Sequence, residues 1–490
     1  MTETLSPEQN YAFEKFKRGE NLFITGPGGT GKTKLIKHLM RYSKATGQNI
    51  QVCALTGCAT VLLNCGARTI HSWSGIKLAK GDKDRVIQSV LKNKGAKNAW
   101  KKTRVLIVDE ISMMSKKILE ILDEVGKLIR HNPLPFGGIQ VVFTGDFFQL
   151  PPVGDDEEPD TTAFCFETPV WNQLFKADNH IELTTIFRQT DPLYVKILEK
   201  IRRGDIDAET VDVLQRYVKR NYDPSQHNGV TPTKLFPIRS KVDYVNSMMF
   251  AKLDEDEYEF EFTANTQCKT NMDTGKLLSF EELNKGQRLS SKELEYEIDN
   301  LVNNTRCSRI LRLKKGAAVL CMINLDMDNS ICNGSQGVIT RIYDVDNVTR
   351  VEVLFSNGVL KQMDPHIWQS EEYPTITIKQ FPLCLAWALT IHKIQGATLA
   401  MAEVDIGQSV FEYGQTYVAL SRVQSLDGLY LSAFQPNRVR ANPKVIEFYK
   451  NIMKRDLSKH TVSSLTFEDY ELKEEPIETV PDTNIKVIKI

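Results

Sequence analysis

The stretch NLFITGPGGTGKTKL, residues 21–35, decides the fold of the first part of the chain. Residues 21–25 are an apolar run that predicts a buried strand, and a glycine-rich loop follows it. The glycines let backbone N–H groups curl inward towards phosphate oxygens. Lys32 can then reach the outer phosphates, the Thr33 hydroxyl can ligate Mg²⁺, and the helical pattern that follows turns its N-terminus towards the anion. The predicted triphosphate-binding residues are Gly26, Pro27, Gly28, Gly29, Thr30, Gly31, Lys32 and Thr33.

The bulk composition is that of an ordinary globular protein. The 490 residues are 41% hydrophobic and 25% charged, and this length suits about three domains. No run of about eighteen apolar residues occurs, so we expect no membrane span. The formal net charge is zero, so any nucleic-acid binding would need a local basic patch.

Nine cysteines without a C-x-x-C pair predict free thiols rather than a metal site. The closest group is Cys53, Cys58 and Cys65, in an apolar stretch. Buried free thiols are typical of a reducing compartment. The N-terminal MTETLSPEQNYAF carries acids and lacks the apolar core of a secretory signal. We therefore expect the protein in the nucleus or cytoplasm.

The first part of the chain alternates strands and helices. Strands are predicted at 21–25, 50–55, 104–109 and 140–145, with helical patterns between the first two and over 115–130. This alternation predicts an α/β fold in which helices cover both faces of a parallel sheet. Ligands of such sheets gather at the carboxyl ends of the strands, where the glycine-rich loop lies.

A second alternating region begins near residue 178 and returns at 384–434, and between its halves short strands with Asn-Gly and Asp-Asn turns predict an all-β insertion. Residues 252–315 give no readable pattern. The acidic C-terminal tail is expected to be disordered. The predicted ranges are 1–177 for the first α/β domain, 178–315 and 379–450 for the second, 316–378 for the all-β insertion, and 451–490 for the tail.

Residues 77–104 form a basic insertion in the first domain. Ten Lys and Arg against two Asp give a local charge of +8 (10 − 2). Two interpretations stay open. The segment, which contains Trp100, can be a wedge at the point where nucleic-acid strands part, or a solvated lysine-rich helix, as most charge runs are.

The block VLIVDEISMM, residues 105–114, ends an apolar strand on Asp109 and Glu110. At a strand tip one carboxylate can hold Mg²⁺ through water while the other polarises the attacking water. Two such acids can also be merely solvated, but the phosphate loop that precedes them favours catalysis. Gln149 follows another strand tip, where an amide can sense the γ-phosphate with support from Asp146; an ordinary loop glutamine is the alternative.

Two arginines supply the positive charge that the first domain lacks. Arg188, in ELTTIFRQ, and Arg422, in YVALSRVQS, lie at or beside the ends of elements in the later region. A guanidinium from a facing domain can stabilise charge on a phosphoryl group in transfer. Taken singly, each arginine would be read as a surface charge.

Ten blocks in this order resemble the PIF (petite integration frequency) DNA helicases, which are the RecD-like, 5′-to-3′ branch of helicase superfamily 1. The resemblance covers about residues 5 to 440. The blocks are LSPEQ (5–9), GPGGTGKT (26–33), ALTGCAT (54–60), GARTIHSWSGI (66–76), LIVDEISMM (106–114), TGDFFQLPPV (144–153), FRQTDPLYVKILEKIRRGD (187–205), NGSQGVI (333–339), LTIHKIQGATL (389–399) and YVALSR (417–422).

The resemblance implies two RecA-like P-loop domains with ATP and Mg²⁺ between them, and a small SH3-like β insertion. It implies that Gln9 reads the adenine edge and that Thr33 and Asp109 hold the metal. The implied catalytic residues are Lys32, Asp109, Glu110, Gln149, Arg188 and Arg422. Two positions depart from the family pattern, Ile394 in place of serine and Cys58 in place of isoleucine or valine.

The same resemblance implies contacts with a single DNA strand. Hydroxyls, imidazoles and backbone N–H groups suit phosphate and sugar contacts, and aromatic rings suit base stacking. Trp73 can instead belong to the core, and His71 can be a capping histidine. The implied DNA-binding residues are Thr56, Gly57, His71, Trp73, Phe147, Thr390, His392 and Lys393. No base-reading pattern occurs, so we expect sequence-tolerant, salt-sensitive binding.

The expected activity is ATP-dependent 5′-to-3′ translocation on single-stranded DNA, with unwinding of duplex or G-quadruplex DNA, in replication, recombination or repair. The expected partners are single-stranded DNA and its junctions with duplex, bound by a monomer, with no membrane. The acidic tail can dock a protein, compete with DNA for the basic groove, or have no role. The rivals are an RNA helicase, which the 2′-OH would distinguish, a nucleotide-switched binding module and a small-molecule kinase.

Overall fold

The computed structural model describes residues 5–453 except 64, 156, 224–229, 273–274, 306, 327, 346–347, 371, 392–393 and 395. Residues 454–490 of the predicted acidic tail, His392 and Lys393 therefore lie outside the described residues, whereas residues 451–453 belong to the last helix. No helix in the part of the chain described here is both long and apolar enough to cross a bilayer.

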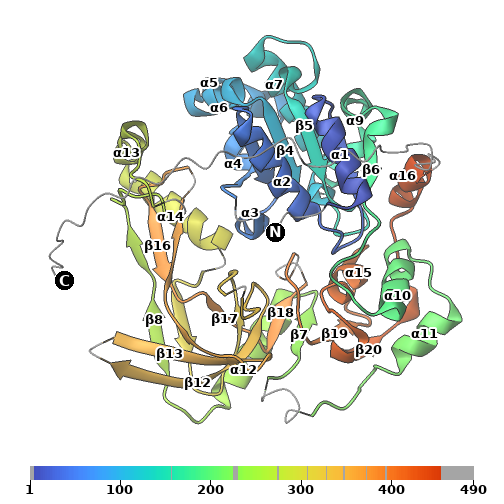
Figure 1. Ribbon diagram of the computed structural model, residues 1–490, viewed down its shortest axis with the longest axis vertical. Helices are drawn as coiled ribbons and strands as arrows, with labels where there is room; N and C mark the ends of the chain where they lie inside the picture. The colour runs from blue at the N-terminus through green and yellow to red at the C-terminus, as the bar shows by residue number, and fades with distance from the viewer. Residues whose placement is uncertain are drawn as a thin grey trace, which may run out of the picture. The chain divides into compact units, whose positions relative to one another are not determined.

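The first lobe is built on a six-stranded parallel sheet with the order β3-β2-β4-β5-β1-β6 (Figure 1). The α/β fold with a parallel sheet predicted from the sequence is confirmed. The strands are β1 (Leu22–Thr25), β2 (Ile50–Ala54), β3 (Arg68–Thr69), β4 (Val105–Asp109), β5 (Gln140–Thr144) and β6 (His180–Glu182). The helices are α1 (Pro7–Lys17), α2 (Lys32–Ala45), α3 (Gly57–Leu63), α4 (Ile70–Ser74), α5 (Lys83–Lys92), α6 (Lys94–Lys102), α7 (Lys116–Arg130), α8 (Pro159–Thr162) and α9 (Pro169–Leu174).

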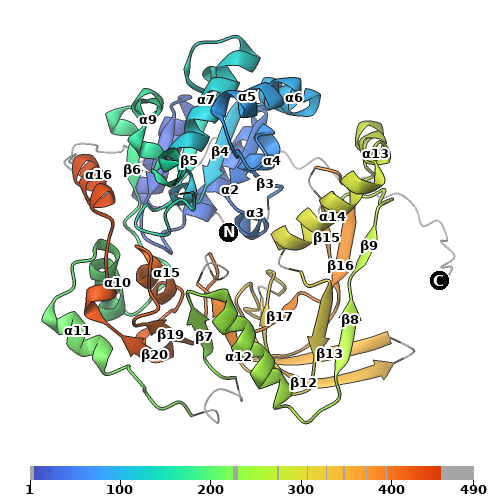
Figure 2. The same cartoon turned by 180° about the vertical axis from the view of Figure 1, so that it is seen from behind.

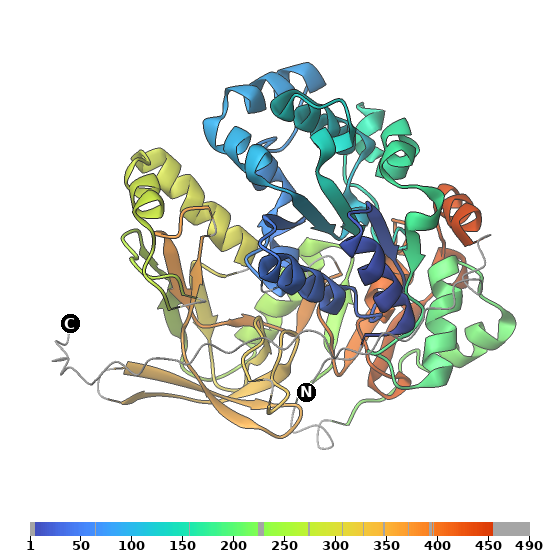
Figure 3. The same ribbon diagram turned by 45° about the horizontal axis from the view of Figure 1, so that its top comes forward.

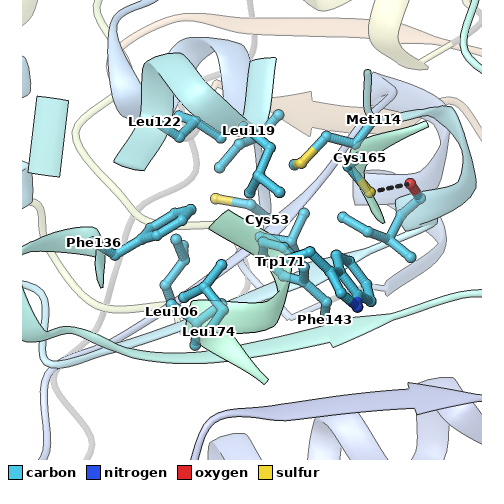
Figure 4. Packing of buried hydrophobic residues seen from close by; sticks show 14 of the residues in the cluster. Cys53, Leu106, Met114, Leu119, Leu122, Phe136, Phe143, Cys165, Trp171 and Leu174 are labelled. Atoms are coloured by element: carbon cyan, nitrogen blue, oxygen red, sulfur yellow. Dashed lines mark hydrogen bonds between the residues drawn. The ribbon is translucent and has the colours of Figure 1, made fainter. Parts of the chain in front are cut away.

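The continuous apolar runs of these strands arise because both faces of the sheet are covered. Successive side chains of a strand point to opposite faces. Phe23 joins one hydrophobic core, and its neighbours Leu22 and Ile24 join the other. Figure 4 shows the first of these cores, where Phe143 and Trp171 pack beside Cys53 and Cys165. The cysteines whose side chains are described are all free, as predicted.

The basic insertion folds as two short helices, α5 and α6, packed on α7. Asp82 and Asn93 cap them, and their apolar side chains Ile87, Val90 and Trp100 are buried. The indole N–H of Trp100 donates to the Ser74 carbonyl at 3.1 Å. The geometry therefore fits a lysine-rich surface with a packed inner face, and Trp100 has no free ring face to offer to a parting duplex.

The second lobe has a four-stranded parallel sheet with the order β18-β7-β19-β20. Helix α12 packs on β7 and β18 (Figure 2). The strands are β7 (Thr233–Phe236), β18 (Ala388–Thr390), β19 (Ala402–Ile406) and β20 (Leu429–Phe434), and the helices are α10 (Pro192–Arg203), α11 (Ala208–Gln215), α12 (Arg239–Ala251) and α15 (Gln415–Leu420). A last helix, α16 (Pro443–Met453), follows β20 but places Val445 and Tyr449 in the core of the first lobe.

The predicted all-β insertion contains a five-stranded antiparallel sheet with the order β14-β13-β12-β11-β17. Its strands are β11 (Ala318–Cys321), β12 (Gln336–Val345), β13 (Val348–Phe355), β14 (Leu360–Met363) and β17 (Leu383–Leu385). Because β17 pairs with β11, the sheet extends past the predicted end of the insertion at residue 378.

The unreadable segment 252–315 contributes strands whose partners are distant in sequence. Strand β8 (Tyr258–Glu261) pairs with β10 (Ile310–Leu313), and β9 (Thr263–Asn265) joins β15 (His366–Gln369) and β16 (Thr377–Gln380). Its two helices, α13 (Phe280–Gln287) and α14 (Ser291–Thr305), are drawn in yellow in Figure 3, and α14 packs on β15 and β16. Local patterns could not reveal these long-range pairings.

The packing of Trp100 yields a stability prediction. Trp100→Ala removes a fully buried indole and its hydrogen bond, so we expect the free energy of unfolding to fall by about 3–5 kcal/mol. Lys101→Ala, on the exposed side of α6, should change it by less than about 0.5 kcal/mol. Denaturant titration of both variants measures this. A Trp100→Ala variant of unchanged stability would contradict the packed interpretation.

Candidate nucleotide site and nucleic-acid interface

The glycine-rich loop runs from the end of β1 into the first turn of α2. Gly31 caps α2 with φ 80°, a left-handed conformation that favours glycine. A Cβ at Gly31 would lie 2.6 Å from Nε2 of Gln9, so any side chain there would displace the Gln9 amide as well as strain the backbone. The loop therefore brings backbone N–H groups and the helix N-terminus to one point, as a phosphate site requires.

Lys32 lies inside this loop. Its Nζ donates to the carbonyls of Gly26 at 2.7 Å and Pro27 at 2.9 Å. Burial lowers the pKa of Lys32, while the nearby carboxylates, Asp146 foremost, oppose that shift. Thr33 is exposed on the first turn of α2. The loop thus holds the ammonium where an anion would be bound.

Two carboxylates end β4 beside the loop. Asp109 is buried and accepts a hydrogen bond from the Thr144 hydroxyl. Burial raises the pKa of Asp109, which the Thr144 bond and the charge of Lys32 oppose. Glu110 has φ 56° and ψ 43°, a left-handed conformation that costs of order 1–3 kcal/mol outside glycine and is frequent at functional sites.

The carboxylates beside the phosphate loop are better suited to binding Mg²⁺ together with nucleotide phosphates than to binding a metal through protein ligands alone. Within the described residues, no three His, Cys, Asp or Glu side chains are grouped as a metal cluster would need. Mg²⁺ is commonly bound by one or two carboxylates together with substrate phosphates. Asp109 at the end of β4 and Thr33 on the first turn of α2 carry oxygen donors of the kind that Mg²⁺ takes.

Arg188 and Arg422 both reach the phosphate loop from the far side of the site. A Cβ built on Gly28 would lie 3.3 Å from Nη1 of Arg188 and 3.5 Å from Nη2 of Arg422. Arg188 donates to the Ser421 carbonyl at 3.2 Å, and Arg422 donates to the Val418 carbonyl at 2.9 Å. Burial, and then the charge of Arg422, lower the pKa of Arg188 to about 9. Two buried guanidiniums side by side repel each other, so an anion between them would relieve both.

Gln149 and Asp146 occupy the loop after β5. Gln149 is 5% exposed, and its Oε1 has no hydrogen-bond partner in the described structure. An unsatisfied buried acceptor is costly, which fits a donor supplied from outside the chain, such as water. The Asp146 carboxylate is held by the Arg202 guanidinium at 2.9 and 3.0 Å. Asp146 supports Gln149 through its backbone carbonyl, which accepts the Gln149 N–H at 2.9 Å.

Three residues at the site were not singled out from the sequence. The Tyr417 hydroxyl accepts the Gly28 N–H at 2.9 Å, and Gln189 donates to the Ser421 carbonyl at 3.1 Å. The Phe187 ring is 58% exposed beside Gly31. Their only signal in sequence was their place in the blocks FRQ and YVALSR.

Gln9 is fully buried against the phosphate loop. Its Nε2 donates to the carbonyls of Thr30 at 3.3 Å and Gly31 at 3.4 Å, and its Oε1 accepts the Ser6 N–H at 3.0 Å. The Nε2 end of the amide therefore braces the loop, and the Oε1 end completes the cap of α1 at Ser6. A contact between Gln9 and the adenine edge stays a prediction.

The residues expected to touch DNA fall into two groups. Thr56 and His71 are partly exposed, and burial lowers the pKa of His71. Gly57 and Thr390 are buried at the ends of β2 and β18, respectively. His392 and Lys393 lie outside the described residues. His71 does not cap α4, because Thr69 does so.

The stacking prediction for Trp73 and Phe147 is contradicted by their burial, since each ring is 1% exposed. Trp73 packs on Trp100 at a centroid distance of 4.5 Å, and Phe147 lies 5.4 Å from Phe23. Both rings belong to the first-lobe core. Ile394, which departs from the family serine, is fully buried in the core of the second lobe.

The site is that of a two-lobed P-loop NTPase, in which the phosphate loop of one lobe faces arginines from beyond that lobe. Family models for the PIF1-like helicase and for the 2B domain of the DNA helicase Pif1 match residues 4–212 and 298–342. The Pif1 helicase of Candida albicans, a solved structure, is 32% identical, covers 92% of this chain and 100% of its own, and has a TM-score of 0.68. The chain belongs to the PIF1-like helicase family.

Two further relatives carry information on ligands and length. Bacteroides Pif1 helicase, solved in complex with ADP-AlF3 and single-stranded DNA, is 26% identical, covers 92% of this chain and 98% of its own, and has a TM-score of 0.58. The ATP-dependent DNA helicase PIF1 of Emericella nidulans is 32% identical over 89% of this chain. This chain spans 61% of that relative's length.

The Tyr417 contact yields a binding prediction. The phenol occupies the Gly28 N–H that a phosphate oxygen would need, so Tyr417→Phe should tighten binding of ATP, by about threefold to tenfold for one hydrogen bond. Tyr296→Phe, an exposed position on α14, should leave it unchanged. Calorimetric titration with a non-hydrolysable ATP analogue measures both. Weaker binding by Tyr417→Phe would show that the phenol assists ATP instead.

Proposed function

We propose that this chain is an ATP-dependent DNA helicase that moves 5′-to-3′ along single-stranded DNA and unwinds duplexes. The observation that carries the proposal is the approach of Arg188 and Arg422 to the phosphate loop at Gly28. A nucleotide bound there would touch both lobes. Its hydrolysis would therefore change how the lobes are held together, which is what a motor needs.

The nucleotide chemistry is assigned to groups already at the site. Lys32 binds the outer phosphates, and Thr33 and Asp109 hold Mg²⁺, which neutralises charge on the phosphates. Glu110 polarises the attacking water, and Gln149 orients it through its unsatisfied Oε1. Arg188 and Arg422 stabilise the transferring phosphoryl group. Phe187 offers an exposed ring to the base.

Transmission between the lobes runs through residues 145–150. Phe148 packs in the core of the first lobe and Leu150 in the core of the second. A Cβ at Gly414 would lie 2.6 Å from the carbonyl oxygens of both Phe148 and Gln149, so the second lobe packs closely on this loop. A change in the position of Gln149 when ATP is hydrolysed would therefore alter the packing of both lobes.

The track is a single DNA strand at the carboxyl ends of β2 and β18. Thr56 and Gly57 follow β2, Thr390 ends β18, and His71 lies on α4 after β3. Their hydroxyl, backbone and imidazole groups suit phosphate and sugar contacts. The complex of Bacteroides Pif1 helicase with single-stranded DNA supports this choice of polymer. We propose that the chain acts as a monomer on DNA, with ATP closing the lobes and product release reopening them.

Lys32→Ala tests the phosphate site. Without the ammonium we expect DNA-stimulated ATP hydrolysis to be abolished while DNA binding is retained. Lys44→Ala, an exposed lysine of the same helix, should hydrolyse ATP at the normal rate. Phosphate release and fluorescence anisotropy measure the two properties. Normal turnover in Lys32→Ala would refute the assigned site.

Arg188→Ala tests the contribution from beyond the first lobe. The variant should bind ATP but lose about a thousandfold in kcat, the scale of an arginine that stabilises a phosphoryl transition state. Arg203→Ala, which removes a half-exposed guanidinium from α10, is the matched control. Single-turnover hydrolysis measures the rate. An unchanged kcat in Arg188→Ala would leave the arginine without a catalytic role.

Polarity and polymer choice test the motor itself. We expect ATP-driven unwinding of a duplex with a 5′ single-stranded overhang and none with a 3′ overhang. A DNA overhang should stimulate hydrolysis more than an RNA overhang of the same sequence. A strand-displacement assay with the four substrates measures this. Unwinding from the 3′ overhang would contradict the direction, and preference for RNA would contradict the substrate.

A further inference from the structure

A second polar cluster lies away from the nucleotide site, between the first lobe and the β insertion. It lines a cavity of about 240 Å³. Arg68 of β3 and Ser72 of α4 face it from the first lobe. Glu297 faces it from α14, and Trp368 and Glu372 face it from the β insertion. The nucleotide chemistry uses none of these side chains.

Three of these side chains bond to one another across the boundary. Nη2 of Arg68 donates to Oε2 of Glu372 at 2.8 Å and to Oγ of Ser72 at 3.0 Å. The Ser72 hydroxyl donates to the same Glu372 oxygen at 2.8 Å. The side chains of Arg68 and Glu372 are only 18% and 30% exposed, respectively. We call Arg68, Ser72 and Glu372 the clasp.

The Glu372 carboxylate leaves part of the Arg68 guanidinium without a hydrogen-bond partner. Nε of Arg68 is buried and has no hydrogen-bond partner in the described structure, so Glu372 engages one side of the planar fork only. A phosphate is bound best when two guanidinium N–H groups donate to two of its oxygens. A tetrahedral phosphate could take Nη2 and Nε together and leave a further oxygen for Ser72.

The clasp lies beside the proposed path of the DNA strand. Arg68 pairs in register with Cys53 of β2, and β2 leads directly to Thr56 and Gly57. Ser72 is next to His71 in sequence. A strand that runs along this edge of the sheet would therefore bring its backbone towards Arg68 and Ser72.

Two acids, Glu297 and Glu372, line the cavity. Burial, and then the charge of Glu372, raise the pKa of Glu297 to about 7. Nζ of Lys285 donates to the Glu372 carbonyl at 2.9 Å and lies 3.7 Å from its carboxylate. Because two acids share the cavity, Glu372 would repel an incoming phosphate unless it moved aside.

We propose that Arg68 and Ser72 form a binding site for a backbone phosphate of single-stranded DNA, and that the Glu372 carboxylate is an internal competitor for it. The proposal rests on the proposed DNA-binding function. It makes the β insertion a gate, because strand binding at this point requires the clasp to open. The chain's apparent DNA affinity is then reduced by the fraction of molecules whose clasp is closed.

The test uses the full chain and measures affinity for a fluorescent oligo-dT at several salt concentrations. Glu372→Gln keeps the size of the side chain and weakens its hold on Arg68, so affinity should rise about threefold or more. Arg68→Ala removes a phosphate contact, so affinity should fall and the slope of log affinity against log salt should shrink by about 0.7. Glu281→Gln, an exposed carboxylate on α13, controls for the loss of one negative charge.

Opposite signs for the two variants are the decisive result. A clasp that only joins the lobe to the insertion would make Glu372→Gln and Arg68→Ala shift DNA affinity in the same direction, which would overturn the proposal. The double variant, Arg68→Ala with Glu372→Gln, should bind DNA as tightly as Arg68→Ala alone, because Glu372 no longer has an Arg68 guanidinium to compete for. Thermal unfolding checks that each variant is folded. Arg68→Lys keeps the positive charge but lacks the planar guanidinium, so its DNA affinity should lie between those of the unaltered chain and Arg68→Ala. If the unaltered chain bound no oligo-dT at all, the proposed function would fail instead.

Discussion

The buried ion pair between Asp146 and Arg202 is the constraint on which the arrangement of the two lobes depends. Both side chains are fully buried, and the guanidinium holds both carboxylate oxygens. Arg202 also lies over the rings of Phe148 and Tyr449, 4.7 and 5.5 Å from their centroids. Removing one partner of such a pair strands a charge in the interior and typically costs 3–5 kcal/mol.

This pair brings three separate segments together. Asp146 follows β5 of the first lobe, Arg202 belongs to α10 of the second, and Tyr449 comes from α16. The Tyr449 hydroxyl lies 2.6 Å from the hydroxyl of Thr25, the residue before the phosphate loop. The phosphate loop and the elements that carry the arginines are therefore tied to one buried point.

The features that could be predicted from the sequence are those that depend on neighbouring residues and on their chemistry. Consecutive apolar residues predicted the strands of the first sheet, and glycines followed by Lys32 predicted the phosphate loop, because each signal lies within a few residues. The family resemblance, now confirmed, placed Arg188 and Arg422 at the loop. It did not separate packing from binding for Trp73 and Phe147, since an aromatic ring in a family block serves either purpose. The pairing of β8 with β10 and the contact of Arg68 with Glu372 join distant segments, and no local pattern encodes them.

Helix α16 has a consequence for the order in which the protein is made. The aromatic core of the first lobe is closed by Tyr449 and Val445, from a segment that the ribosome produces after the whole second lobe. Phe448 stacks on Phe166 at a centroid distance of 4.2 Å. A nascent chain that has emerged only as far as β6 therefore carries an unfinished first lobe with apolar rings open to water. Synthesis must run almost to residue 453 before that lobe is sealed, so completion of the two lobes is coupled during translation.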